Sequence, residues 1–204
     1  MTAPNRGLRF ARPTMRAAIG WLAVLLTLAL GRVITTSLPS PDDAGVRPFV
    51  TSAAAGQTAG LRSGDVAITD VVGAPRLANV GQEMVSPGLF VRVTYRYTAR
   101  ERPSELTSTS VEAANGWTYA AGLGDRTPLS CAPAAPGMPV ICSFVVEMPP
   151  DRLVGARARF AAEEDAAYDS VGLLDLGITA EQVRSWQAAT QPLTVADPYY
   201  EGRS

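Results

Sequence analysis

The chain has 204 residues, 47% apolar and 18% charged, a balance that fits one folded domain together with a membrane-inserting segment. All 18 basic residues are arginine and histidine is absent, which excludes Schiff-base lysine chemistry and removes the commonest general base and metal ligand. Five arginines and no acid precede residue 38, and the remainder carries 13 − 19 = −6, so nucleic acid is not an expected partner.

Residues 1–14 are expected to be a short cytoplasmic N-terminus, followed by a transmembrane signal anchor over residues 15–37. Residues 17–31 contain no charged side chain, and four arginines precede them. As a helix this stretch covers roughly 22 Å, and extension past Arg32 closes the gap to a hydrocarbon core of ~30 Å if that side chain snorkels. The positive-inside bias then places the N-terminus in the cytoplasm and the rest of the chain outside.

A cleaved signal peptide is the alternative, because its apolar region is commonly of this length. A cut after Gly31 would put Ala29 and Gly31 at the small-residue positions but would leave Arg32 at the new N-terminus. We therefore favour a single-pass protein of the cell membrane, with the lipid bilayer as a partner through residues 15–37. The alternative is a secreted protein.

Residues 38–62 are rich in Pro, Ala, Gly, Ser and Thr without a clear period, which predicts a flexible linker. Beyond it the pattern indicates strands. In Leu89–Tyr97 every second residue is apolar, whereas Arg92, Thr94 and Arg96 share the other face. Val140–Met148 is apolar on both faces, which predicts a central strand that ends at two prolines.

Two shorter features complete the strand pattern. Asn115-Gly116 between strand-like runs predicts a hairpin with a type I′ turn, and places Trp117 and Tyr119 in the hairpin core. Val171–Ile178 is expected to be the last strand. At least six short strands with no long helix between them predict an all-β protein, an immunoglobulin-like antiparallel β-sandwich over residues 63–178.

Residues 179–204 are expected to form a short helix and a tail. Thr179 followed by Gln182 has the form of a capping box, and Val183 and Trp186 then share one helix face that can dock on the sandwich. Tyr199 and Tyr200 are expected to lie in a disordered tail rather than in a docking motif.

Cys131 and Cys142 are the only cysteines, and an even number in an exported chain predicts a disulfide. Two buried free thiols are the weaker alternative. No metal site is expected, because the chain has neither histidine nor a Cys-x-x-Cys motif. No cofactor-binding motif is present either, since a P-loop and a complete Gly-x-Gly-x-x-Gly are absent.

This arrangement resembles the telokin-like, immunoglobulin-like extracellular domain of bacterial surface proteins, a family of unknown function of the immunoprotective extracellular type. The matching features, over about residues 60–178, are Leu89–Tyr95, Asn115–Tyr119, Pro136-Gly137, Phe144–Pro149 and Val171–Ile178. The resemblance implies a fold and an extracellular location and transfers no active site. The disulfide pair, the C-terminal helix and the tail depart from the family pattern.

The sequence contains no recognisable nucleophile with a base, so we do not expect an enzyme. We expect a membrane-anchored extracytoplasmic binding module of a bacterial envelope, an accessory partner of another envelope or membrane protein. A passive structural or secreted envelope protein is the alternative. Arg92 and Arg96 mark the expected partner-binding face, because arginine is enriched at protein interfaces.

Overall fold

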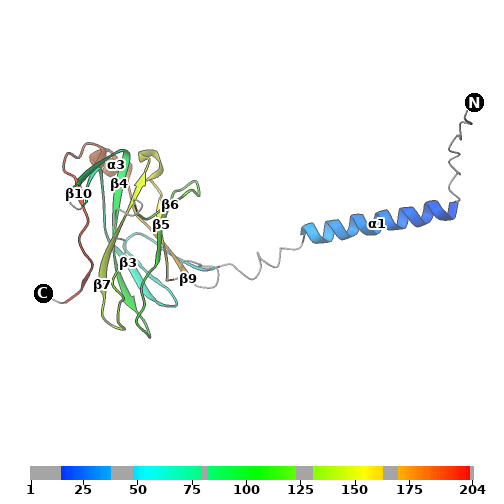
Figure 1. Cartoon of the computed structure of the whole chain (residues 1–204), viewed down its shortest axis with the longest axis horizontal. Coiled ribbons are helices and arrows are strands. Elements are labelled where there is room, and N and C mark those ends of the chain that lie inside the picture. Colours follow the sequence, from blue (N-terminus) through cyan, green and yellow to red (C-terminus); the bar gives the residue numbers. More distant parts are fainter. Residues whose placement is uncertain (1–14, 38–47, 80–81, 123–130, 163–169, 203–204) are drawn as a thin grey trace, which may run out of the picture. The chain divides into compact units, whose positions relative to one another are not determined.

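The computed structural model describes residues 15–37, 48–79, 82–122, 131–162 and 170–202 (Figure 1). The chain divides into two units, Met1–Val46 and Arg47–Ser204. The first contains helix α1 (Met15–Ser37), and the second contains every described strand. Each unit is treated by itself below.

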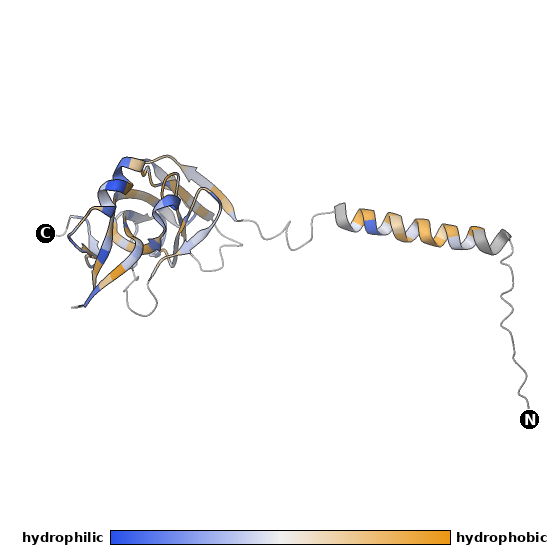
Figure 2. Cartoon of the chain, turned by 90° about the horizontal axis from the view of Figure 1, so that it is seen from above, coloured by the Kyte–Doolittle hydropathy of each residue, from blue (hydrophilic) through white to orange (hydrophobic). Residues whose placement is uncertain are grey.

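The described side chains of helix α1 are mostly apolar. Residues 19–35, whose side chains are described, are all exposed. Arg32 is the charged residue among them. Figure 2 shows the described part of the helix as pale to hydrophobic with one hydrophilic band. The hydroxyls of Thr27 and Thr35 donate to the carbonyls of Ala23 and Gly31, so both find partners within the helix. Among the residues with described side chains, no helix combines the length and apolarity needed to cross a membrane.

The second unit is a β-sandwich, as the strand pattern predicts. Within its described residues, eleven strands form two sheets. Sheet A has the order β1 (Phe49–Ala53), β9 (Ser170–Asp175), β8 (Arg157–Ala161), β5 (Ser108–Glu112), β6 (Thr118–Ala120). Sheet B has the order β10 (Leu193–Thr194), β3 (Gly64–Asn79), β4 (Gln82–Ala99), β7 (Val140–Met148), β11 (Tyr199–Tyr200), with β2 (Thr58–Gly60) on β3. Among the strands of the described residues, β1–β9 and β10–β3 pair in parallel and the other pairs are antiparallel.

The core lies between the two sheets. The alternation of β4 is confirmed, because its apolar residues are at most 2% exposed: Leu89, Val91, Val93, Tyr95 and Tyr97. The Tyr95 ring lies 4.9 Å from Phe160 of sheet A and 6.0 Å from Phe144 of β7, measured between ring centroids. Burial, reinforced by the negative charge of Glu105, raises the pKa of the Tyr95 hydroxyl above its ordinary value, so it ionises at a higher pH than an exposed tyrosine.

The sandwich begins earlier than the sequence predicts. Strands β1 and β2 lie inside the segment 38–62 that was predicted to be a linker. β1 is short and contains Thr, Ser and Ala, and its partner β9 lies far along the chain, with Phe49 opposite Ser170. Local periodicity cannot reveal a strand whose hydrogen bonds are supplied by so distant a segment.

Strand β9 ends at Asp175, three residues before the predicted end at Ile178. The Asp175 carboxylate accepts a hydrogen bond of 2.8 Å from the Gly177 amide, and Gly177 has a φ of +63°. This side-chain turn redirects the backbone before Ile178, which is nevertheless buried. The strand is also not the last, because β10 and β11 follow it.

The hairpin between β5 and β6 is present, but its turn differs from the predicted one. The Gly116 amide donates to the Ala113 carbonyl, the Ala113 amide donates to Trp117, and Gly116 has a φ of +84°. This pattern is typical of a three-residue loop closed by a left-handed glycine. Trp117 directly follows this loop, where its carbonyl accepts from Ala113, and it is 69% exposed, which contradicts its predicted place in the hairpin core, whereas Tyr119 packs against the core.

Helix α3 (Ala180–Gln187) confirms the predicted capping box. The Gln182 amide donates to the Thr179 hydroxyl, and the Thr179 amide donates to the Gln182 side chain. The helix packs Val183 and Trp186 against the main core. The Trp186 ring lies so close to Gly73 of β3 that a Cβ there would be 2.5 Å from the ring. Gly73 is thus required for the docking of α3.

Replacing Gly73 with alanine should lower the free energy of unfolding by roughly 1–3 kcal/mol, because the added methyl group displaces Trp186. Urea unfolding followed by tryptophan fluorescence measures the change. Gly60→Ala is the matched control, since a Cβ at Gly60 would lie 3.5 Å from its neighbours. In a Trp186→Ala background the effect of Gly73→Ala should largely disappear, and an undiminished effect would contradict the assigned contact.

Candidate functional site

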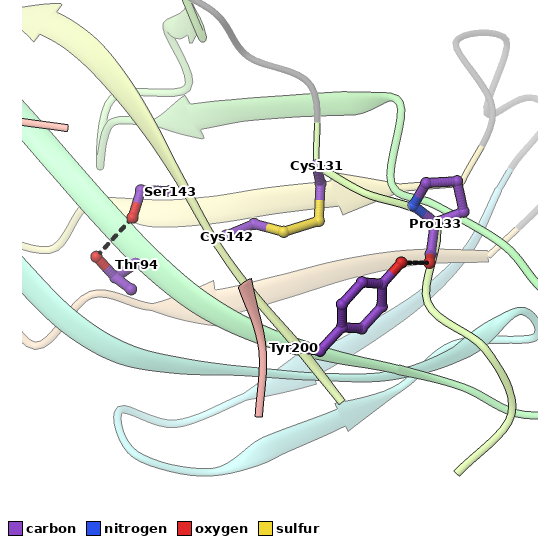
Figure 3. Close-up of a disulfide and its surroundings, with 6 residues drawn as sticks. All are labelled: Thr94, Cys131, Pro133, Cys142, Ser143 and Tyr200. Carbon is purple, nitrogen blue, oxygen red and sulfur yellow. Dashed lines mark hydrogen bonds between the residues drawn. A yellow bond between two sulfur atoms is a disulfide. The ribbon is translucent and has the colours of Figure 1, made fainter. Parts of the chain in front are cut away.

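A disulfide joins Cys131 to Cys142, as the cysteine count predicts (Figure 3). The two Cα atoms are 5.5 Å apart and both side chains are buried. Cys142 belongs to β7, so the bond ties the start of the segment 131–139, here called the disulfide loop, to the middle of the sandwich. Gly137, with a φ of +74°, provides the turn that returns the loop to β7.

The disulfide loop is also held from its other side. Ser104 and Ala134 exchange two backbone hydrogen bonds, of 3.1 and 2.9 Å. The Ser104 hydroxyl lies 2.7 Å from the hydroxyl of Tyr97, which is itself a core residue of β4. The loop is therefore fixed both to β7 and to the segment after β4.

The C-terminal tail, defined as residues 193–201, is bound to sheet B rather than disordered. β10 pairs with Leu77 and Ala78 of β3, and β11 pairs with Val140 and Ile141 of β7, on the opposite edge of the sheet. The tail runs along the side of sheet B that faces away from sheet A (Figure 1). Strands of two residues leave almost no periodic signal, which explains why the sequence predicts disorder here.

The tail makes three further polar contacts near β11. The Tyr200 hydroxyl donates to the Pro133 carbonyl over 3.1 Å (Figure 3). The Glu201 amide donates to the Pro139 carbonyl over 2.9 Å, and the Glu201 carboxylate accepts a hydrogen bond of 2.7 Å from Arg96. Two of the three partners are carbonyls of the disulfide loop, so the loop and the tail are joined directly by hydrogen bonds.

Arg92 and Arg96 lie on one face of sheet B, as the strand pattern predicts, and the tail reaches both. Arg92 forms an ion pair of 2.9 Å with Asp70 and donates to the Thr194 carbonyl over 2.7 Å. Arg96 forms the ion pair with Glu201. The sequence indicates the face but not these partners, because Asp70 and Glu201 come from β3 and from the far end of the chain.

A shallow cleft of about 390 Å³ lies where β7 ends. It is lined by Pro87, Gly88, Glu147, Met148, Pro149 and Pro150. The Ser86 hydroxyl donates to the Glu147 carboxylate and accepts from the Gly88 amide. The carboxylate at this cleft is thus already engaged, and the remaining lining is apolar. Among the described residues no cluster of three potential metal ligands occurs.

No protein-family model and no curated protein matches the chain. No family model therefore supports the resemblance to the telokin-like domain. The chain is similar to a solved structure, the crystal structure of an uncharacterised β-sandwich protein from Clostridium difficile 630. The two share 7% identity at a TM-score of 0.42, over 64% of this chain and 96% of that chain.

Proposed function

We propose that the chain is a membrane-anchored extracytoplasmic binding module, an accessory partner of another envelope protein, without a catalytic role. The observation that carries this proposal is helix α1, whose described apolar side chains are all exposed. An apolar surface of this extent needs an apolar environment, and a bilayer supplies one around the whole circumference of a helix.

The length of α1 and its polar groups fit such an anchor. Its 23 residues would extend about 34 Å, against a hydrocarbon core of ~30 Å. This length counts residues 15–18 and 36–37 at the two ends of the helix, whose side chains the structure does not describe. The threonine hydroxyls are satisfied by helix carbonyls, and Arg32 lies close enough to one end to snorkel.

The disulfide supports the proposed location outside the cytoplasm. Disulfides persist in oxidising compartments and are rare where glutathione and thioredoxin keep thiols reduced. Cys131 and Cys142 lie on the part of the chain that the positive-inside bias would export. Charge distribution and cysteine chemistry therefore favour the same orientation.

The strand order supports an immunoglobulin-like assignment for the sandwich. Sheet A pairs β5 with β8 and β8 with β9, with β1 parallel to β9, and sheet B pairs β3, β4 and β7. Strands β5, β8 and β9 correspond in order to C, F and G, and β3, β4 and β7 to A, B and E, which supports the assignment. Strand β1, which precedes β3 in the chain, is an addition to that pattern. We extend the proposal to the telokin-like extracellular type, whose strand and turn positions the sequence resembles.

Protease added to intact cells tests the location. It should remove the sandwich and spare an epitope placed at the N-terminus, because the proposed topology puts only the N-terminus inside. A mature protein that begins near Arg32 and is released to the medium would instead establish the secreted alternative.

Cross-linking in intact cells, followed by mass spectrometry, tests the binding role. We expect one or two dominant membrane neighbours, and a weaker cross-link when Arg92 and Arg96 are both replaced by serine at unchanged abundance. Arg76→Ser is the matched control, because Arg76 pairs only locally, with Glu83 of the adjoining strand. Absence of any specific neighbour, or turnover of a cell-wall substrate by the purified chain, would refute the proposal.

A further inference from the structure

The tail occupies a built surface on sheet B. We call this surface the tail site and define it by Pro133, Pro139, Val140, Ile141 and Arg96. Each of these residues contacts β11 or Glu201 through a backbone pair, a carbonyl or a guanidinium group. The tail site thus offers both main-chain and side-chain recognition to an extended segment.

The chemistry of the tail site can be inferred from the residues bound to it. Tyr200 is opposite Val140, packs against the main core, and places its hydroxyl on a carbonyl acceptor. Tyr199, opposite Ile141, points to the other face and is 55% exposed. Glu201 then meets Arg96. The tail site therefore fits an extended peptide in which an aromatic residue with a hydroxyl group is followed by an acid.

The acceptors of the tail site are preorganised. Pro133 and Pro139 belong to the disulfide loop, which is fixed by the disulfide and by its hydrogen bonds with Ser104. A surface whose groups are already held in the binding geometry loses little entropy when a peptide adds to a sheet edge.

Beyond Val195 the tail is held by β11, by the Tyr200 side chain, which packs against the core and donates to Pro133, and by Glu201. β11 pairs over two residues, and the side chains of Arg96 and Glu201 are 44% and 48% exposed, where an ion pair contributes little. A strand that pairs over two residues at a sheet edge opens at a smaller free energy than global unfolding. It can therefore exchange with another segment of the same chemistry.

We propose that the tail site is the recognition surface of the domain, that it takes an extended aromatic–acidic peptide of a partner protein, and that the tail is its intramolecular competitor. This inference rests on the proposed binding function and names its surface and its partner class. The partner segment adds to the edge of β7 in place of β11.

The test uses the full chain in mild detergent, intact or ending at Val195, and a fluorescent peptide of residues 196–202. Truncation after Val195 keeps the packed residues Leu193 and Val195 in place. Fluorescence anisotropy should show binding to the truncated chain and at least tenfold weaker binding to the intact chain, because a tethered competitor acts at roughly millimolar effective concentration.

Reversing the charge of Arg96 tests whether the peptide binds at the tail site. Arg96→Glu in the truncated chain should weaken binding of the peptide about fivefold, and a peptide with Glu201→Arg should restore it. Arg152→Glu is the matched control, because Arg152 pairs with its neighbour Asp151 and lies outside the tail site. Equal binding to the intact and truncated chains, or no effect of Arg96→Glu, would overturn the proposal. Concentration-dependent dimers of the intact chain through this site would overturn it in favour of a second copy.

The same truncation in cells separates this inference from the proposed function. Removing residues 196–204 should increase the yield of the cross-link to the membrane neighbour, since the competitor is gone. An unchanged cross-link would refute the tail site as the recognition surface and leave the binding function standing. Peptide binding without any cross-linked neighbour would refute the binding function instead.

Discussion

Replacing Phe160 with alanine should lower the free energy of unfolding of the sandwich by about 3–5 kcal/mol, the largest effect expected of a single substitution here. Phe160 is fully buried on β8 of sheet A, and its ring meets two aromatic residues of sheet B. The centroid of its ring lies 4.9 Å from that of Tyr95 and 5.8 Å from that of Phe144. The substitution therefore removes transfer free energy, leaves a cavity and breaks aromatic contacts between the two sheets.

Urea unfolding of the intact chain in mild detergent measures this loss, with circular dichroism as the probe. Phe49→Ala is the matched control, because Phe49 is 67% exposed on the edge strand β1, where the centroid of its ring lies 5.8 Å from the guanidinium carbon of Arg62. The control should change stability by less than about 1 kcal/mol. Similar losses for both variants would contradict the assignment of Phe160 to the contact between the sheets.

The interior of the sandwich could be predicted from the sequence because it is built from local periodicity. β7 has the predicted bounds, Val140–Met148, and the apolar set of β4 is buried as predicted. The disulfide could also be predicted, since the chain has only two cysteines. These features need no knowledge of which strands pair.

The periphery could not be predicted, because its order comes from distant partners. β1 is defined by its pairing with β9, and β11 by its pairing with β7. Phe49–Ala53 and Tyr199–Tyr200 have the composition of a linker and of a tail, and only long-range hydrogen bonds make them strands.

The candidate site follows the same division. The face bearing Arg92 and Arg96 is visible as an alternation, and the structure places both side chains on it. Its occupation by Glu201 and the role of the Pro133 and Pro139 carbonyls were not visible. Every residue carries a backbone carbonyl, so the sequence cannot show which carbonyls serve as acceptors at a site. It can indicate only the side chains, here the arginines.

Removing the Cys131–Cys142 bond should lower the free energy of unfolding by about 3 kcal/mol. The bond closes a short loop, with a sequence separation of 11, and the chain-entropy estimate for a loop of this length gives that value. Because both side chains are buried, the Cys131→Ala/Cys142→Ala variant avoids placing unpaired hydroxyls in the core. Urea unfolding with and without reductant should shift for the native chain and stay unchanged for this variant.

Loss of the disulfide should also weaken peptide binding at the tail site. A disulfide that acted on global stability alone would not have this effect. Without it the disulfide loop keeps its hydrogen bonds to Ser104 but loses the bond from Cys131 to β7, so the carbonyls of Pro133 and Pro139 are less firmly placed. The peptide of residues 196–202 should therefore bind the truncated double-alanine chain several-fold more weakly than the truncated native chain. Gly73→Ala, which lowers stability at α3, provides the comparison, because it should leave peptide binding unchanged.

If both thiols of the unreduced, denatured protein react with a maleimide, the bond is absent and this prediction fails. If the bond is present but both destabilised variants lose peptide binding alike, the effect belongs to stability alone and the loop does not organise the tail site.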